Sequence, residues 1–108
     1  MAISKLFSDS DRNRMPNIGV PFSRYIDARV LAAGVAEVHN IPAGANIVFF
    51  AGTGNFYANV DAAAAVPSGD VTNGSASALN PTMRFCGGHS TIGIIAPATC
   101  IVTMEFYS

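Results

Sequence analysis

Side chains that could perform metal or acid–base chemistry are few in this sequence of 108 residues. The two histidines, His39 and His89, are fifty positions apart. A zinc site usually takes three or four His, Cys or carboxylate ligands, often at short spacing, and the sequence contains no His-x-His pair. His89 follows two glycines and is expected to be an exposed loop residue; convergence of His39, His89 and Cys86 on one metal is the disfavoured alternative. We therefore predict no metal and no cofactor.

A nucleophilic or acid–base catalytic site is equally hard to assemble. Ser90 is adjacent to His89, but neighbouring residues on a strand point to opposite faces, and the sequence contains no Gly-x-Ser-x-Gly turn. The carboxylates beyond residue 16 are expected on solvent faces or in loops: Asp27, Glu37, Asp61, Asp70 and Glu105. The sequence therefore predicts a protein that is not an enzyme.

The composition argues against several classes of protein. Half of the residues are apolar and only 12% are charged, whereas disordered chains combine low hydrophobicity with high charge. The net charge is −1, so the sequence gives no sign of the basic surface that neutralises nucleic-acid phosphates. No stretch approaches the ~20 apolar residues that span a bilayer, and no secretory signal is recognisable. We expect a single soluble domain made in a cytoplasm, with no nucleic-acid or membrane partner.

From Ile18 onward, apolar and polar residues alternate with the period of half-buried strands. Turn sequences rich in Gly, Pro and Asn separate these stretches at a spacing of roughly ten residues. The predicted strands cover 25–30, 35–41, 47–50, 56–60, 83–85, 91–95 and 100–107, with a long surface loop at 67–80 and strand or irregular structure, or a single helical turn, at 61–65. The pattern predicts an all-β fold over residues 17–108, an antiparallel β-sandwich that is jelly-roll-like and has seven to eight short strands.

The predicted strands also suggest which side chains are buried. Ile26, Ala28 and Val30 share one face of the first strand, and Tyr25, Asp27 and Arg29 share the other. Four phenylalanines are expected in the core: Phe49, Phe56, Phe85 and Phe106. Cys86 and Cys100 are too few for a disulfide framework and are expected to pack as buried free thiols.

The surface that remains is poor in charge, as the cores of protein–protein contacts are. A free monomer usually carries more charge to stay dispersed. Residues 1–16 are predicted to form an extended N-terminal arm, which is either a disordered terminus or an arm that docks on a partner. The candidate partner-binding residues are Ile3, Leu6, Phe7, Arg12 and Arg14 of the arm, together with Tyr25, Tyr57 and Tyr107, whose polar-tipped rings suit a contact surface.

Four segments together resemble small structural proteins of tailed bacteriophages. They are 41–45 (IPAGA), 55–59 (NFYAN), 65–75 (AVPSGDVTNGS) and 98–107 (ATCIVTMEFY), in the order in which similar segments occur in those proteins. The resemblance spans about residues 35 to 108 and implies a virion component without catalytic residues, either a capsid decoration (cement) protein or another β-sandwich attached to the head or tail. It implies the major capsid protein or other virion proteins as partners, a homo-oligomer, and a place in the virion after synthesis in the host cytoplasm.

A second class of function stays open at this point. Tyr57 with Asn55 and Asn59 offers an aromatic ring beside amide groups, the combination that stacks on and hydrogen-bonds to a sugar. The alternative prediction is therefore a carbohydrate-binding β-sandwich module on a particle surface.

Overall fold

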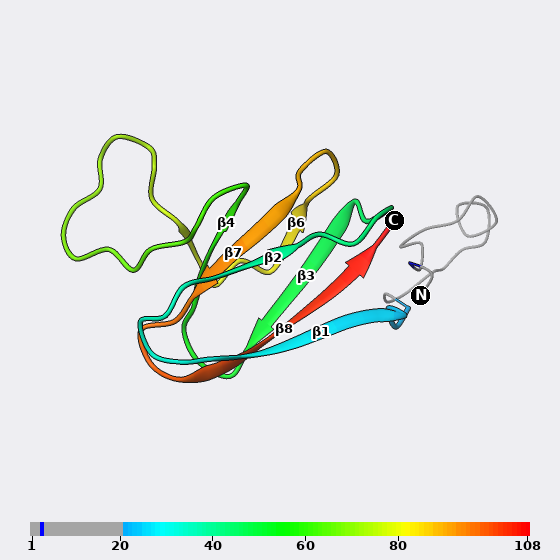
Figure 1. Cartoon of the computed structure of the whole chain (residues 1–108), viewed down its shortest axis with the longest axis horizontal. Helices are drawn as coiled ribbons and strands as arrows, with labels where there is room; N and C mark the ends of the chain where they lie inside the picture. The colour runs from blue at the N-terminus through cyan, green and yellow to red at the C-terminus, as the bar shows by residue number, and fades with distance from the viewer. Residues whose placement is uncertain (1–2, 4–20) are drawn as a thin grey trace, which may run out of the picture.

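The computed structural model describes Ile3 and residues 21–108, and in this part of the chain it contains strands and no helix (Figure 1). Eight strands form two antiparallel sheets of four. The strands are β1 (Tyr25–Leu31), β2 (Glu37–Asn40), β3 (Ile47–Gly52), β4 (Tyr57–Val60), β5 (Ala78–Leu79), β6 (Met83–Phe85), β7 (Thr91–Ile95) and β8 (Cys100–Tyr107). The predicted all-β sandwich is confirmed.

The order of the strands gives the sandwich its topology. The first sheet has the order β1-β8-β3-β6 and the second the order β2-β7-β4-β5. Pairs form between β1 and β8, β2 and β7, β3 and β6, and β4 and β5. The eight strands thus form four antiparallel pairs along one long hairpin. The hairpin is rolled so that successive pairs lie alternately in the first and the second sheet. Two four-stranded sheets wound in this way form a jelly roll, as predicted.

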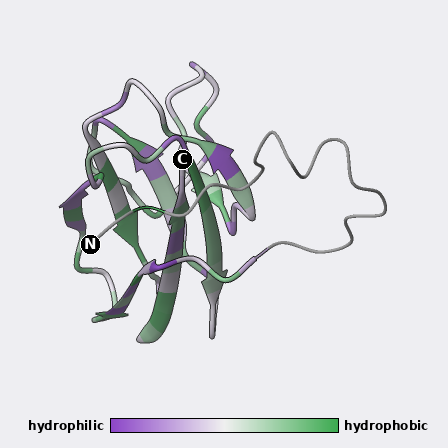
Figure 2. Ribbon diagram, turned by 90° about the vertical axis from the view of Figure 1, so that its right-hand side faces the viewer, coloured by the Kyte–Doolittle hydropathy of each residue, from purple (hydrophilic) through white to green (hydrophobic). Residues whose placement is uncertain are grey.

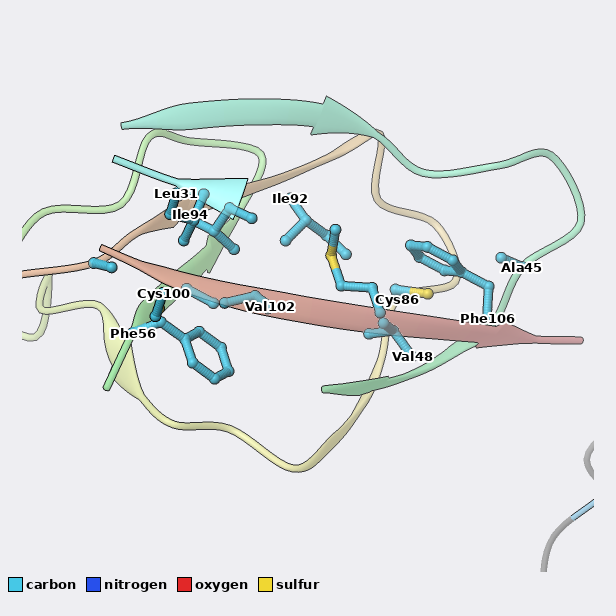
Figure 3. Close-up of a cluster of buried hydrophobic side chains, with 13 residues drawn as sticks. Leu31, Ala45, Val48, Phe56, Cys86, Ile92, Ile94, Cys100, Val102 and Phe106 are labelled. Carbon is cyan, nitrogen blue, oxygen red and sulfur yellow. The ribbon is translucent and has the colours of Figure 1, made fainter. Parts of the chain in front are cut away.

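The core lies between the two sheets and is entirely apolar at its centre (Figure 3). From β8, Val102, Met104 and Phe106 point inward and are almost completely buried, opposite Ile92 and Ile94 of β7. Burying each such side chain contributes about 1.5–3 kcal/mol. The alternation of β8 therefore places one side of the strand in the core, as the sequence predicts.

Residues 61–65 are irregular, one of the three structures that the sequence allowed. They cross the outside of the second sheet at Gly93 of β7. A Cβ atom built on Gly93 would lie 2.3 Å from the carbonyl oxygen of Ala62 and 2.9 Å from the nitrogen of Ala64. Only glycine allows the backbone of this segment to approach the sheet so closely. The rest of the β4–β5 connection, through residue 77, extends away from the sandwich (Figure 1).

Several finer predictions differ from the structure. The loop predicted at 67–80 is interrupted by Ala78–Leu79, which pair with β4. Phe56 and Phe106 are in the core as expected, but Phe85 is an exposed residue of an edge strand and Phe49 is half-buried on the outside of the first sheet. Cys86 and Cys100 are free and buried, as predicted. Burial raises the pKa of the Cys86 thiol, which keeps it protonated.

The predicted arm, residues 1–16, lies outside the described residues except for Ile3. Ile3 is half-buried and packs against the core cluster. The candidate partner-binding residues Leu6, Phe7, Arg12 and Arg14 are likewise outside the described part of the chain.

Candidate protein interface

The outer surface of the first sheet is the most unusual feature of the molecule, because large apolar side chains are exposed on it. Five of them come from three of its four strands: Phe85 is 78% exposed, Val30 67%, Ile26 47%, Met83 44% and Ile101 42%. Figure 2 shows hydrophobic residues along the strands, alternating with hydrophilic ones. We call this surface the outer apolar face, and it consists of Ile26, Ala28, Val30, Ile47, Phe49, Ala51, Met83, Phe85, Ile101, Thr103 and Glu105.

The strand register explains why these residues share one side. Val30 lies opposite Ile101, and Ile26 lies opposite Glu105. Glu105 in turn lies opposite Phe49, which lies opposite Met83. Residues directly opposite one another in a sheet project to the same side. Among these side chains, Glu105 supplies the one ionisable group. The face is therefore continuous across the sheet and almost free of charge.

The orientation of β1 is the reverse of what its polarity suggests. Its apolar residues, Ile26, Ala28 and Val30, point to solvent, whereas Asp27 and Arg29 are half-buried. Asp27 and Arg29 lie opposite Met104 and Val102, which are core residues. An amphipathic strand normally buries its apolar side. The reversal places apolar surface where only another molecule, or a segment outside the described residues, could cover it.

Strand β2, like β1, directs polar side chains toward the inside of the sandwich. Glu37 and His39 lie opposite the core residues Ile94 and Ile92. The ring of His39 forms a 2.7 Å hydrogen bond with Glu37, and Arg29 lies 3.7 Å from Asp27. The expectation that Asp27 and Glu37 occupy a solvent face is therefore wrong. Both belong to edge strands, where an inward charge reaches water at the open side of the sandwich.

One end of the outer apolar face is covered by the segment that leads into β1. The hydroxyl of Tyr107 donates a hydrogen bond to the carbonyl of Pro21, and its ring packs against Phe49 at 5.4 Å between centroids. The Ser23 hydroxyl donates to the carbonyl of Phe106 at 2.6 Å. Burial, followed by the nearby charge of Glu105, raises the pKa of Tyr107. Tyr107 thus stays neutral and anchors residues 21–23.

The tyrosines predicted to form a contact surface are not brought together. Tyr25 points to the inner side of β1 and packs edge-on against Phe106 at 5.8 Å. Tyr57 is half-buried opposite Ile95 and Leu79 in the second sheet. Tyr107 is covered as described above. The exposed residues of the outer apolar face were missed by sequence reasoning. One residue could have indicated this face in the sequence: Ile101 is apolar but lies on the polar side of an otherwise regularly alternating strand.

The amides proposed for sugar binding are partly occupied within the chain. The Asn55 side-chain oxygen accepts a 2.9 Å hydrogen bond from Asn80, and the Asn59 side-chain oxygen accepts one from the backbone nitrogen of Val60. Asn55 is in the turn before β4, beside a hollow of about 410 Å³ whose lining does not include Tyr57 or Asn59. The three residues therefore do not line one pocket.

A second cavity, of about 230 Å³, opens at the β5–β6 side of the sandwich. Its walls are largely apolar and include Phe50, Ala58, Phe85, Cys86 and Ile92, with Arg84 at the same site. Arg84 donates a hydrogen bond to the carbonyl of Met83. The cavity shares Phe85 with the outer apolar face, so the two surfaces meet at β6.

Asp61, the residue directly after β4, has a carboxylate with several hydrogen-bond partners. Its carboxylate is 2.7 Å from Nδ1 of His89 and accepts hydrogen bonds from the backbone nitrogens of Ser90 and Thr91. These contacts, above all the one with His89, lower the pKa of Asp61. His89 is exposed in the turn before β7, as predicted. Asp61 therefore ties the end of β4 to this turn.

Replacing Asp61 with asparagine should make the protein less stable, but only where the carboxylate is ionised. Because folding lowers the pKa of Asp61 below its ordinary value of 3.8, its contribution is present above that pH and is lost as the pH falls through the folded value. The difference in unfolding free energy between wild type and Asp61→Asn should shrink as the pH falls from about 5 through the folded pKa of Asp61. Urea unfolding at each pH measures it, and a constant difference would contradict the role assigned to the carboxylate.

Comparisons with known proteins identified no relative of this chain. No protein family matches this chain, and neither a curated protein nor a solved structure is significantly similar to it. Within the described residues, no three His, Cys, Asp or Glu side chains gather as a metal site, and none of these residues form a helix long and apolar enough to cross a membrane. The class of protein defined here is a jelly-roll sandwich with one apolar sheet surface.

Proposed function

We propose that this chain is a non-enzymatic structural protein of a bacteriophage virion, a capsid decoration (cement) protein that stabilises the particle through protein–protein contacts. The observation that carries the proposal is the outer apolar face, on which Ile26, Val30, Ile101, Met83 and Phe85 are exposed. Its partner would be the major capsid protein or another virion protein. The protein would be made in the host cytoplasm and reside in the virion.

The energetics of such a face favour attachment to a large assembly. Monomeric proteins rarely expose a contiguous apolar surface larger than a few hundred Å². Covering it contributes about 25 cal/mol per Å² of apolar area removed from water. In a particle this contribution is repeated at every copy, so a modest contact per molecule strengthens the whole shell. Glu105 lies within the face and would need a donor on the partner, because a buried charge without a partner is costly.

The jelly-roll architecture is compatible with the same proposal, but it is equally compatible with other functions. Jelly rolls of eight strands occur in viral capsid proteins, and also in lectins and cupins, so the fold by itself allows several functions. The resemblance of 41–45, 55–59, 65–75 and 98–107 to phage structural proteins narrows this choice. The low charge of the chain, 12% of residues, suits a surface that is largely covered by other protein.

The proposal is tested on particles that contain the protein and particles from which its gene has been deleted. Mass spectrometry of purified virions should find the chain in many copies. Particles without it should release their genome at a lower temperature or after a milder osmotic shock, and adding the purified protein should restore their stability. Absence of the chain from virions, together with unchanged stability of the deletion particles, would refute the proposal.

A further inference from the structure

The outermost strand of the first sheet, β1, has an unpaired side. Within the described residues it pairs with β8 alone, and the sheet ends there. It is seven residues long, whereas β6 at the opposite edge has three. Edge strands that stay monomeric are commonly short or interrupted by proline, lysine or a bulge, and β1 contains no proline or lysine. A long, uninterrupted edge of this kind is a template for another strand.

We propose that two copies of this chain pair through β1, antiparallel, around a two-fold axis that passes between their Ala28 residues. Such a dimer needs no virion component and goes beyond the function proposed above. A two-fold axis perpendicular to the sheet does not exchange the two sides of the sheet. Inward-pointing residues of one copy therefore lie opposite inward-pointing residues of the other. In this register all seven residues of each strand are paired. The pairs are Tyr25 with Leu31, Ile26 with Val30, Asp27 with Arg29, and Ala28 with Ala28.

The charges of β1 select this register over its neighbours. With Ala28 at the axis, Asp27 of each copy lies opposite Arg29 of the other, and opposite charges facing each other across strands stabilise a sheet. The adjacent two-fold registers have Asp27 or Arg29 at the axis. They bring two carboxylates or two guanidinium groups together and pair fewer residues. The strand is therefore self-complementary in one register only.

The state of Arg29 in the single chain is consistent with a missing partner. Its Nε atom is buried and has no hydrogen-bond partner among the described residues, and the carboxylate of Asp27 is 3.7 Å from its terminal nitrogen. A carboxylate from a second copy would give the guanidinium a better-placed acceptor. An inward charge on an edge strand also disfavours pairing with an unrelated strand, so the same two residues exclude other partners while accepting an identical one.

Pairing would join the first sheets of the two copies into one sheet of eight strands. Their outer apolar faces would then be continuous, because Ile26 of one copy lies beside Val30 of the other. The two side chains are 47% and 67% exposed in the single chain and would partly cover each other. The dimer would thus present a surface twice as wide to whatever the face binds.

Cross-linking at the axis tests the arrangement directly in the full-length protein without any particle. Opposite residues of an antiparallel pair have Cα atoms about 4.5–5.5 Å apart, within the range of a disulfide. Ala28→Cys should therefore form a disulfide-linked dimer under mild oxidation. Ile26→Cys is the matched control, because residue 26 of one copy would lie opposite residue 30 of the other. The two new cysteines would be about 13 Å apart along the strands and should cross-link far more slowly. The native Cys86 and Cys100 are buried and should not react.

Charge exchange at the same strand provides the second test, measured by sedimentation of the purified proteins. Wild type should be dimeric. Asp27→Arg alone and Arg29→Asp alone should each be monomeric, since both place like charges opposite each other. A mixture of the two variants should form a heterodimer, and the double variant D27R/R29D should recover the homodimer. The proposal is overturned if wild type is monomeric at about millimolar concentration, well above the Kd of stable dimers. It is also overturned if the mixture stays monomeric or Ala28→Cys cross-links no faster than Ile26→Cys.

Discussion

Replacement of Gly93 by alanine is expected to lower the unfolding free energy by about 2–3 kcal/mol, the upper range for adding an atom to a fully packed site. The added Cβ would lie 2.3 Å from the Ala62 carbonyl oxygen and 3.0 Å from the Ala63 Cα. Both are backbone atoms, so no side chain can rotate away to make room. Either the segment over Gly93 lifts off the sheet, which uncovers the buried Ala64, or β7 shifts within the core.

Denaturant unfolding followed by intrinsic fluorescence or circular dichroism measures this loss. Gly69 is the matched control, since a Cβ built there meets nothing within 4 Å and its alanine variant should stay within about 0.5 kcal/mol of wild type. If Gly93→Ala were as stable as Gly69→Ala, the close contact between residues 62–64 and the second sheet would not exist in solution.

The strands with clear alternation between turn residues could be predicted from the sequence. The predicted strand at 91–95 coincides with β7, and that at 100–107 coincides with β8. In β8, Val102, Met104 and Phe106 are inside as expected. Such strands are bounded by turn residues such as Pro97, and their apolar side matches the core side. For these strands, the alternation of apolar and polar residues and the burial of one side in the core both predict the same strand and the same orientation.

The direction in which β1 faces could not be predicted. Alternation separates Ile26 and Val30 from Asp27 and Arg29, but it does not say which set points inward. That choice depends on what covers each side of the strand. Here Tyr25 and Leu31 occupy the inner side and belong to or pack against the core, so the charged residues between them must share it. A rule that always buries the apolar residues of a strand therefore fails for β1, whose apolar residues are exposed.

The exposure of Phe85 was missed for a related reason. Apolar residues are often buried, but more than half of an ordinary protein surface is also apolar, so the residue type alone does not decide. Phe85 lies on β6, an edge strand of three residues, on the side opposite the core. Its exposure follows from the pairing of β6 with β3 and from the sheet order, which depend on contacts between distant segments. The low overall charge predicts an interface, but it does not indicate where on the surface that interface would lie.

Charging the outer apolar face at Phe85 should abolish or strongly weaken attachment to the particle while leaving the fold intact. Phe85→Glu removes an aromatic ring that is 78% exposed, so the free energy of unfolding should change by no more than about 0.5 kcal/mol. If the face is covered in the particle, the loss of one buried aromatic side chain costs about 1.5–3 kcal/mol, and burying the new carboxylate costs more. The attachment affinity should fall by at least roughly tenfold to a hundredfold.

Val38→Glu is the control that separates this face from the rest of the surface. Val38 is 50% exposed and lies on β2, at the outside of the second sheet, so the same charge is added to another exposed apolar position. Binding of purified variants to particles lacking the protein measures both affinities, and thermal unfolding verifies the fold of each. Because β6 is the edge of the first sheet opposite β1, Phe85→Glu should leave dimerisation unchanged. Equal attachment of wild type and both variants would show that the particle, if it binds this chain, does so through a surface other than the outer apolar face.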